Sequence, residues 1–211
     1  MKLNRISLIM TLFASVAFAQ QWEAGGIGGF GITPDATATG STGSASIGLK
    51  NGGMLGGFAG ADDYARLGGE ASYLYRFSDL KVSSGGQEVN LAGHSQFVDF
   101  RMLVHFAPRE SNIRPFVAVG GGVGIYSGTG EPNAAQPLNN FVALTNTRET
   151  KPMVSGAVGL KCKVSPHVAL RFEVRDYATP FPNRLIAPAP GIALSGWLNN
   201  IAVVGGIGGV F

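Results

Sequence analysis

The feature that most constrains the fold is a strict two-residue alternation in residues 167–176, HVALRFEVRD. Large apolar side chains occupy successive even positions, namely Val168, Leu170, Phe172 and Val174. Charged side chains occupy the odd positions Arg171, Glu173 and Arg175. In a β-strand, side chains alternate between two faces, so this segment predicts a strand with one apolar face and one ionic face.

Two environments accept such a strand. In a membrane barrel the apolar face contacts lipid and the charges line the lumen, because one arginine facing the bilayer midplane costs about 2–4 kcal/mol. In a soluble sheet the apolar face covers a core and the charges face water. The rest of the chain has to distinguish the two.

The first residues predict export. Residues 1–5 contain Lys2 and Arg5, residues 6–18 are apolar, and Ala17-Phe18-Ala19 has the small-residue pattern of a cleavage site. Together they predict a secretory signal peptide at residues 1–19 and a mature domain at residues 20–211. The apolar segment is too short to be interpreted as a spanning helix.

Charge and cysteine content exclude several functions. The formal charge of +3 falls to +1 when the two basic residues of the signal peptide are removed, which gives no reason to expect nucleic-acid binding. Cys162 is the only cysteine, so an intrachain disulfide and a cysteine-based metal cluster are excluded. An exported domain without disulfides needs another source of stability, and a closed ladder of backbone hydrogen bonds in lipid is one.

Eight segments of the mature chain have the length and alternation of strands that cross a bilayer at a tilt. They span residues 22–33, 53–61, 64–77, 94–106, 113–126, 152–164, 167–176 and 197–211. The first contains Gly26-x-Gly28-x-x-Gly31, which matches the spacing of a dinucleotide-binding loop. Because a signal peptide precedes it and Pro34 and a loop follow, we interpret these glycines as part of a curved strand.

The connections alternate in length. Residues 34–52, 78–93, 127–151 and 179–196 form long connections, whereas residues 62–63, 107–112 and 165–166 form short turns. In an up-and-down barrel, alternate connections lie at the same end. The chain therefore predicts four long loops at one end and three turns with both termini at the other, which is typical of bacterial outer-membrane barrels.

Aromatic residues are predicted to form two girdles at the membrane interfaces. The turn-end girdle contains Trp22, Tyr64, Phe116 and Phe211. The loop-end girdle contains Tyr75, Phe77, Tyr126, Tyr177 and Trp197.

The opposite strand face collects a polar cluster that is predicted to line the lumen. It comprises Arg66, Glu70, Arg76, Asp99, Arg101, His105, Lys161, Lys163, Arg171, Glu173 and Arg175. The cluster is either a salt-bridged core or a gated path for ions or small solutes. An eight-stranded barrel is only wide enough inside for its own side chains, which favours the core. The surplus of cations indicates that some of them lie near the ends, in water.

These features resemble the small eight-stranded outer-membrane barrels, the OmpA-like and OmpW-like transmembrane domains. The resemblance is architectural and covers nearly the whole mature chain. It implies an all-β, eight-stranded antiparallel up-and-down transmembrane barrel in the outer membrane, monomeric and surrounded by outer-membrane lipids and lipopolysaccharide. It also implies that the barrel-assembly machinery recognises Phe211. Because the sequence stops at the barrel, a peptidoglycan-binding domain is not expected.

Three alternatives remain open. A lipid A deacylase-like enzyme would use a His-x-Ser pair, but His94, His105 and His167 are followed two positions later by Gln96, Ala107 and Ala169, so catalysis is not expected. A small-solute channel and a soluble lipocalin-like carrier are the other two. No cofactor or metal is predicted. The apolar segment 140–144 could form a lid, contact lipopolysaccharide, bind a partner or cover the barrel mouth.

Overall fold

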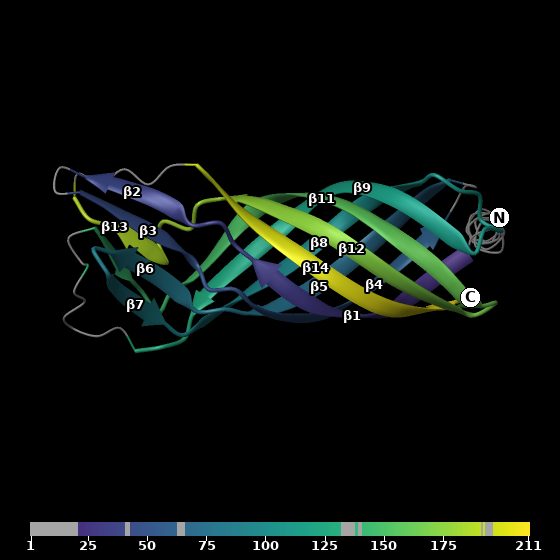
Figure 1. Ribbon diagram of the computed structural model, residues 1–211, viewed down its shortest axis with the longest axis horizontal. Coiled ribbons are helices and arrows are strands. Elements are labelled where there is room, and N and C mark those ends of the chain that lie inside the picture. Colours follow the sequence, from purple (N-terminus) through teal and green to yellow (C-terminus); the bar gives the residue numbers. More distant parts are fainter. Residues whose placement is uncertain are drawn as a thin grey trace, which may run out of the picture.

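The computed structural model describes residues 21–40, 43–62, 66–131, 138, 141–190, 192 and 196–211. Within them, eight strands close into an antiparallel barrel in which strands adjacent along the chain pair and the first pairs with the last (Figure 1). These strands are β1 (Gln21–Ile32), β4 (Gly52–Asp62), β5 (Leu67–Phe77), β8 (Gly93–His105), β9 (Ile113–Gly128), β11 (Arg148–Ser165), β12 (Val168–Pro180) and β14 (Trp197–Val210). The predicted up-and-down barrel is confirmed. The predicted signal peptide lies outside the described residues.

The strand registers fix the stagger of the barrel. We followed the paired residues from strand to strand around the barrel, starting at Ile32 on β1. The path returns to β1 at Trp22, which is ten residues from the start. With about 3.3 Å per residue and about 4.8 Å between strands, this stagger corresponds to a strand tilt of about 40°. The backbone hydrogen bonds therefore form a continuous tilted ring.

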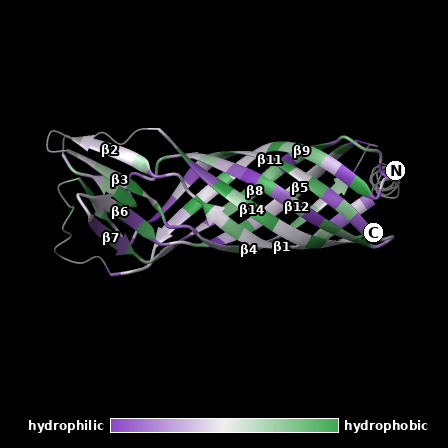
Figure 2. Ribbon diagram, in the orientation of Figure 1, coloured by the Kyte–Doolittle hydropathy of each residue, from purple (hydrophilic) through white to green (hydrophobic). Residues whose placement is uncertain are grey.

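The two strand faces have opposite character, as the alternating colours of Figure 2 show. On β12, Phe172 and Val174 point outward and are 57% and 45% exposed. The outer face of the barrel carries the large exposed apolar side chains of the described chain, including Leu55, Phe100, Val119, Val158 and Ile207. One carboxylate interrupts this face at Asp176, which lies among Val119, Val174 and Ile201. The outer surface is therefore suited to hydrocarbon.

The barrel has a turn end and a loop end. At the turn end, β1 begins and β14 ends, and the backbones of Trp22 and Phe211 exchange hydrogen bonds of 3.2 and 2.9 Å. Short connections after β8 and β11 lie at the same end. The predicted turn at residues 62–63 is only partly described, because residues 63–65 lie outside the described chain. No helix among the described residues has the length and hydropathy needed to span a bilayer.

The described parts of the long connections at the loop end contain six further strands, where the sequence predicted only loops (Figure 1). A four-stranded sheet has the order β2–β3–β6–β7, and a second sheet pairs β10 with β13. These strands are β2 (Ala36–Gly40), β3 (Gly43–Leu49), β6 (Leu80–Ser84), β7 (Gln87–Leu91), β10 (Val142–Leu144) and β13 (Ile186–Pro188). We call these six strands and their connections the cap.

The cap has an apolar interior of its own. Ile47, Leu80 and Val82 from the four-stranded sheet are at most 1% exposed, and they belong to the same buried cluster as Phe141 and Ile186. Of the roles considered for segment 140–144, covering the barrel mouth agrees with this burial; Asn140 itself is not described. The opposite face of the sheet is polar and carries hydroxyl, amide and charged groups, including Thr37, Ser44, Lys81, Glu88 and Asn90.

The hairpin of β6 and β7 has a two-glycine turn and a paired carboxylate. Gly85 and Gly86 connect the strands with positive φ angles of 57° and 81°, a backbone conformation that glycine adopts without steric strain. On β7, Glu88 accepts a hydrogen bond from Asn90 at 2.9 Å and forms an ion pair with Lys50 at 3.2 Å. These two interactions lower the pKa of the Glu88 carboxyl.

Candidate functional site

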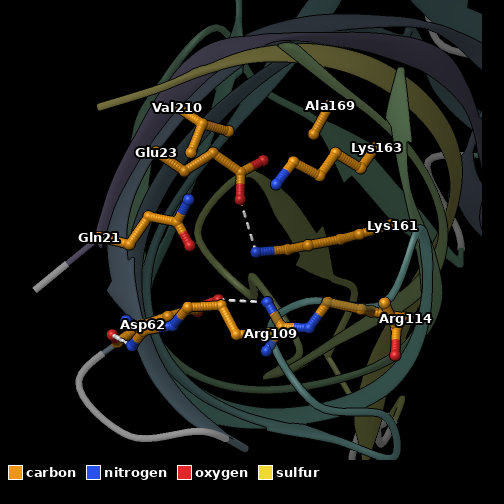
Figure 3. A pocket seen from close by; sticks show the side chains of 10 residues that line it. Gln21, Glu23, Asp62, Arg109, Arg114, Lys161, Lys163, Ala169 and Val210 are labelled. Atoms are coloured by element: carbon orange, nitrogen blue, oxygen red, sulfur yellow. Dashed lines mark hydrogen bonds and ion pairs between the residues drawn. The ribbon is translucent and has the colours of Figure 1, made fainter. Parts of the chain in front are cut away.

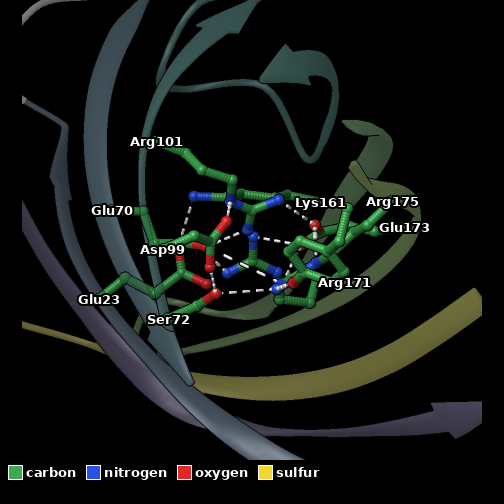
Figure 4. A network of polar contacts seen from close by, with 10 residues as sticks. Glu23, Glu70, Ser72, Asp99, Arg101, Lys161, Arg171, Glu173 and Arg175 are labelled. Carbon is green, nitrogen blue, oxygen red and sulfur yellow. Dashed lines mark hydrogen bonds and ion pairs between the residues drawn. The ribbon is translucent and has the colours of Figure 1, made fainter. Parts of the chain in front are cut away.

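The barrel interior contains a cluster of ionic side chains from one strand pair and from the wall opposite it (Figure 4). Strands β5 and β8 provide carboxylates, a hydroxyl and an arginine, and β12 provides two arginines and a carboxylate. We call this cluster the central network; its members are Glu70, Ser72, Asp99, Arg101, Arg171, Glu173 and Arg175.

Two glutamates link the three arginines. Glu173 Oε2 lies 3.1 Å from Arg101 Nη1 and 2.7 Å from Arg175 Nε. The other oxygen of Glu173 pairs with Arg171 Nη2. Glu70 Oε2 lies 2.6 Å from Arg171 Nη1, and Glu70 Oε1 pairs with Arg101 Nη2. Each glutamate therefore connects side chains from different parts of the wall.

Asp99 completes the charge balance. Its Oδ2 lies 3.2 Å from Arg101 Nε, and its Oδ1 accepts a hydrogen bond from the Ser72 hydroxyl. Arg175 Nη1 donates to the Ser72 and Tyr177 hydroxyls, each at 3.0 Å. Three guanidinium groups thus face three carboxylates, and their side chains are 0–3% exposed. Because buried ions must be paired, this balance allows the charges to remain inside the barrel.

Inward-facing glycines make room for these side chains. A methyl group at Gly159 would lie 2.6 Å from Phe116 Cζ and 2.8 Å from Glu173 Cγ. One at Gly120 would lie 2.8 Å from Arg101 Cγ. These separations are well inside the roughly 3.5–4.0 Å at which carbon atoms attract each other. The glycines of the barrel therefore complement the large ions across the lumen.

Aromatic rings surround the network. The Arg171 guanidinium lies 4.0 Å from the centre of the Phe58 ring, within the range of a cation–π contact. Towards the loop end, the rings of Phe97 and Tyr177 stack with centres 4.8 Å apart. The network and these rings together fill the middle of the barrel.

Arg76 lies closer to the cap and is fully buried. Its guanidinium donates to Thr33 Oγ1 at 2.6 Å and to Asn200 Oδ1 at 3.1 Å. It also donates to the carbonyl oxygens of Gly31 and Lys50, at 3.2 and 2.9 Å. Neutral oxygen atoms therefore provide the hydrogen-bond acceptors of this cation, and Arg76 joins the cap to the barrel wall.

The sequence profile described as "Outer membrane protein beta-barrel domain" matches residues 6–184, which is most of the chain. The chain belongs to this family. A member of the family is located in the outer membrane, and a closed barrel is one of the two structures that can span a membrane. No curated protein matches the sequence.

Two solved structures show the same fold. The outer membrane protein OprG from Pseudomonas aeruginosa has a TM-score of 0.61 and 12% sequence identity, with 92% of this chain and 96% of OprG covered. Neisserial surface protein A (NspA) has a TM-score of 0.54 and 12% identity, with 90% of this chain and 97% of NspA covered. At these identities the likeness establishes the architecture alone.

Within this family fold, the structure brings six of the predicted lumen residues into the central network: Glu70, Asp99, Arg101, Arg171, Glu173 and Arg175. Arg76 lies apart from them near the cap. Lys161 and His105 lie nearer the turn end, where Lys161 Nζ is 2.6 Å from Glu23 Oε2. The His105 ring is buried, and its nitrogen atoms have no hydrogen-bond partner in the described chain.

One predicted lumen position is wrong, and a second lies only at the mouth of the barrel. Arg66 is exposed and precedes β5, so it is not a lumen residue. Its backbone carbonyl accepts a hydrogen bond of 2.7 Å from the backbone N–H of His105. Lys163 has the inward alternation but is exposed, because β11 reaches the end of the barrel there. Alternation assigns a face but does not show where the wall stops.

The aromatic girdle is only partly as predicted. Trp22, Phe77, Trp197 and Phe211 are exposed on the outside, and Tyr75 is half-buried. The prediction is wrong for Tyr126, Tyr177 and Phe116, which are 0–1% exposed inside the barrel. Tyr177 is separated from the inward Arg175 by an even number of residues, and so is Tyr126 from the inward Ala118, so both rings point inward. The prediction grouped these tyrosines by their distance from the loops and did not consider which strand face they occupy. Tyr64 is outside the described residues.

Sequence reasoning missed several inward polar residues. Ser72 and Asn200 lie on the inner face of β5 and β14, and Glu23, Asp62 and Arg114 lie near the turn end. The alternation would have identified them if it had been applied to hydroxyl and amide side chains as well as charges, and extended to the ends of each strand. No group of three or more histidine, cysteine, aspartate or glutamate side chains in the described chain is arranged to hold a metal ion.

Proposed function

We propose that this protein is a closed, non-catalytic outer-membrane barrel that interacts with other molecules through its cap. The observation that carries the proposal is the burial of the central network. Its ionic side chains extend from β5 and β8 to β12 and are 0–3% exposed, so they occupy the cross-section through which a solute would have to pass. An eight-stranded barrel leaves little other space.

Conductance across a planar bilayer tests this proposal. The protein should show no sustained opening. The double variant Arg101→Ala, Glu173→Ala removes one cation and one anion, so the remaining charges stay balanced while the cross-section is emptied. We expect this variant to show transient openings. A sustained open state of the unmodified protein would contradict the proposal.

The histidines support a non-catalytic role. A buried base for nucleophilic catalysis would contact a serine or another nucleophile, whereas the His105 ring contacts the Phe116 ring, with centres 5.7 Å apart. His94 stacks on Tyr75 at 5.1 Å. Incubation of the protein with lipid A followed by mass spectrometry should release no fatty acid, and a released acyl chain would refute this part of the proposal.

We assign two sets of partners to the outer surfaces. The polar face of the cap, which carries Thr37, Lys81 and Glu88, is suited to the sugars and phosphates of lipopolysaccharide. The exposed ring of Phe211, 80% accessible at the turn end, is suited to recognition by the barrel-assembly machinery. In cells, Phe211→Ala should slow the appearance of folded barrel in a pulse-chase experiment, whereas Phe77→Ala should not. Equal rates for the two variants would argue against recognition of Phe211.

A further inference from the structure

A second polar region lies inside the turn end of the barrel (Figure 3). It is a small cavity of about 40 Å³ whose ionic lining comes from β1, β4, β9, β11 and the connection between β8 and β9. We call it the vestibule; its ionic residues are Glu23, Asp62, Arg109, Arg114, Lys161 and Lys163.

The vestibule differs from the central network in its charge. Its described lining has four cationic side chains and two carboxylates, an excess of two positive charges. Each carboxylate has one ion pair, because Lys161 Nζ lies 2.6 Å from Glu23 Oε2 and Arg114 Nη1 lies 2.5 Å from Asp62 Oδ2. The other oxygen of Glu23 is buried without a hydrogen-bond partner among the described residues. The network in the middle of the barrel neutralises itself, whereas the described residues of the vestibule do not.

Two cationic groups are available for a further partner. Lys163 is exposed at the mouth, and Figure 3 shows its ammonium group directed into the vestibule. The backbone N–H of Lys163 donates to Asn112, at 2.7 Å, but its ammonium group has no hydrogen bond or ion pair within the described chain. Arg109 donates through Nη2 to the backbone carbonyl of Asp62, but its buried Nε has no hydrogen-bond partner among the described residues. A buried donor without a partner costs free energy, so an acceptor is favoured at this position.

An anion satisfies both conditions. Lysine ammonium and arginine guanidinium groups form strong charge-assisted hydrogen bonds with phosphate oxygens. The excess of positive charge favours an anion, whether a phosphomonoester, with about two negative charges near neutral pH, or the singly charged phosphodiester of a lipid. We propose that the vestibule binds a phosphate group, with Lys163 and Arg109 as its principal ligands. The phosphate belongs either to a small phosphorylated solute or to a phospholipid headgroup at the turn end.

Calorimetry with detergent-solubilised protein in a phosphate-free, non-ionic detergent tests the first source. The titrants are inorganic phosphate and glycerol 3-phosphate. We expect one phosphate for each barrel and roughly tenfold weaker binding in Lys163→Met and in Arg109→Met, the effect of losing one charged hydrogen bond. Lys81→Met, which removes a cap lysine paired with Asp35 at 2.8 Å, is the matched control and should bind as tightly as the unmodified protein.

Native mass spectrometry of protein released from nanodiscs tests the second source. The nanodiscs contain phosphatidylcholine with a minor fraction of phosphatidylglycerol. Retention of one phosphatidylglycerol, lost in Lys163→Met and Arg109→Met, would assign the phosphate to a lipid. Heat-modifiable electrophoresis verifies that each variant is folded. Absence of binding in both experiments, or binding that neither substitution weakens, would overturn the proposal.

Discussion

Glu173 is the residue on which the central network depends most directly, because it pairs with all three arginines. Glu173→Gln would leave three guanidinium groups facing the carboxylates of Glu70 and Asp99. An unpaired buried charge typically costs about 3–5 kcal/mol, so we expect the free energy of unfolding to fall by that amount. Urea unfolding in lipid vesicles measures it.

The matched control is Glu88→Gln, which weakens an ion pair on the exposed face of the cap, where Glu88 lies 3.2 Å from Lys50. Exposed pairs of this kind contribute about 0–1 kcal/mol. Similar losses in the two variants would mean that the central network is not the main electrostatic contribution to stability.

Gly159 and Gly156 lie three residues apart on β11, Gly159 on the inner face of the barrel wall and Gly156 on the outer face. Gly159→Ala would bring a methyl group against Phe116 and Glu173, whereas Gly156→Ala would project into open space on the outer face. Overpacking in a filled interior costs about 1–3 kcal/mol. We expect that loss in the free energy of unfolding for Gly159→Ala and almost none for Gly156→Ala. Equal effects would show that the network shifts to accept the added methyl group.

At the scale of secondary structure, the barrel strands could be predicted and the cap strands could not. Residues 167–176 alternate between apolar and charged side chains over a whole strand. They do so because the lipid face requires apolar side chains and the lumen face accepts charged ones. The cap strands have three to seven residues, and their apolar positions, such as Leu80 and Val82, are satisfied only by contact with distant segments. Local alternation over so few residues does not distinguish a strand from a loop.

The central network was predictable as a set of inward charges but not as a set of pairs. The sequence places Glu70, Arg101 and Glu173 on the inner face of their strands. Which carboxylate meets which guanidinium depends on the barrel stagger, which brings Glu70 to Arg171 from strands that are not adjacent. Registers are set by the whole closed sheet, so no single segment contains this information.

The cap should unfold separately from the barrel. Ile47→Asp would place a charge in the buried cluster of the cap, where Ile47 is fully enclosed. We expect external trypsin to cleave this variant at Lys50 or Lys81 while the barrel remains heat-modifiable. Thr37→Asp, on the exposed face of the same sheet, should stay resistant. Loss of the folded barrel in Ile47→Asp would show that cap and barrel unfold as one unit.

At the scale of the whole molecule, insertion depends on the outer surface. Val174 is 45% exposed and lies on the lipid face among apolar neighbours. Val174→Arg should lower the free energy of unfolding from lipid vesicles by about 2–4 kcal/mol, the cost of an arginine near the bilayer midplane. Thr39→Arg, on the exposed face of the cap, should change it little. Equal stability of the two variants would mean that Val174 does not face hydrocarbon.

The pairing of β1 with β14 has a consequence for how amide protons exchange with solvent. Every barrel strand has two neighbours, so no strand can detach without breaking two ladders, whereas β2 and β7 each have a single neighbour in the described cap. In deuterated buffer, amides of the cap edges should therefore exchange through local openings within minutes to hours. Barrel amides should exchange together, and only as fast as the entire ring comes apart.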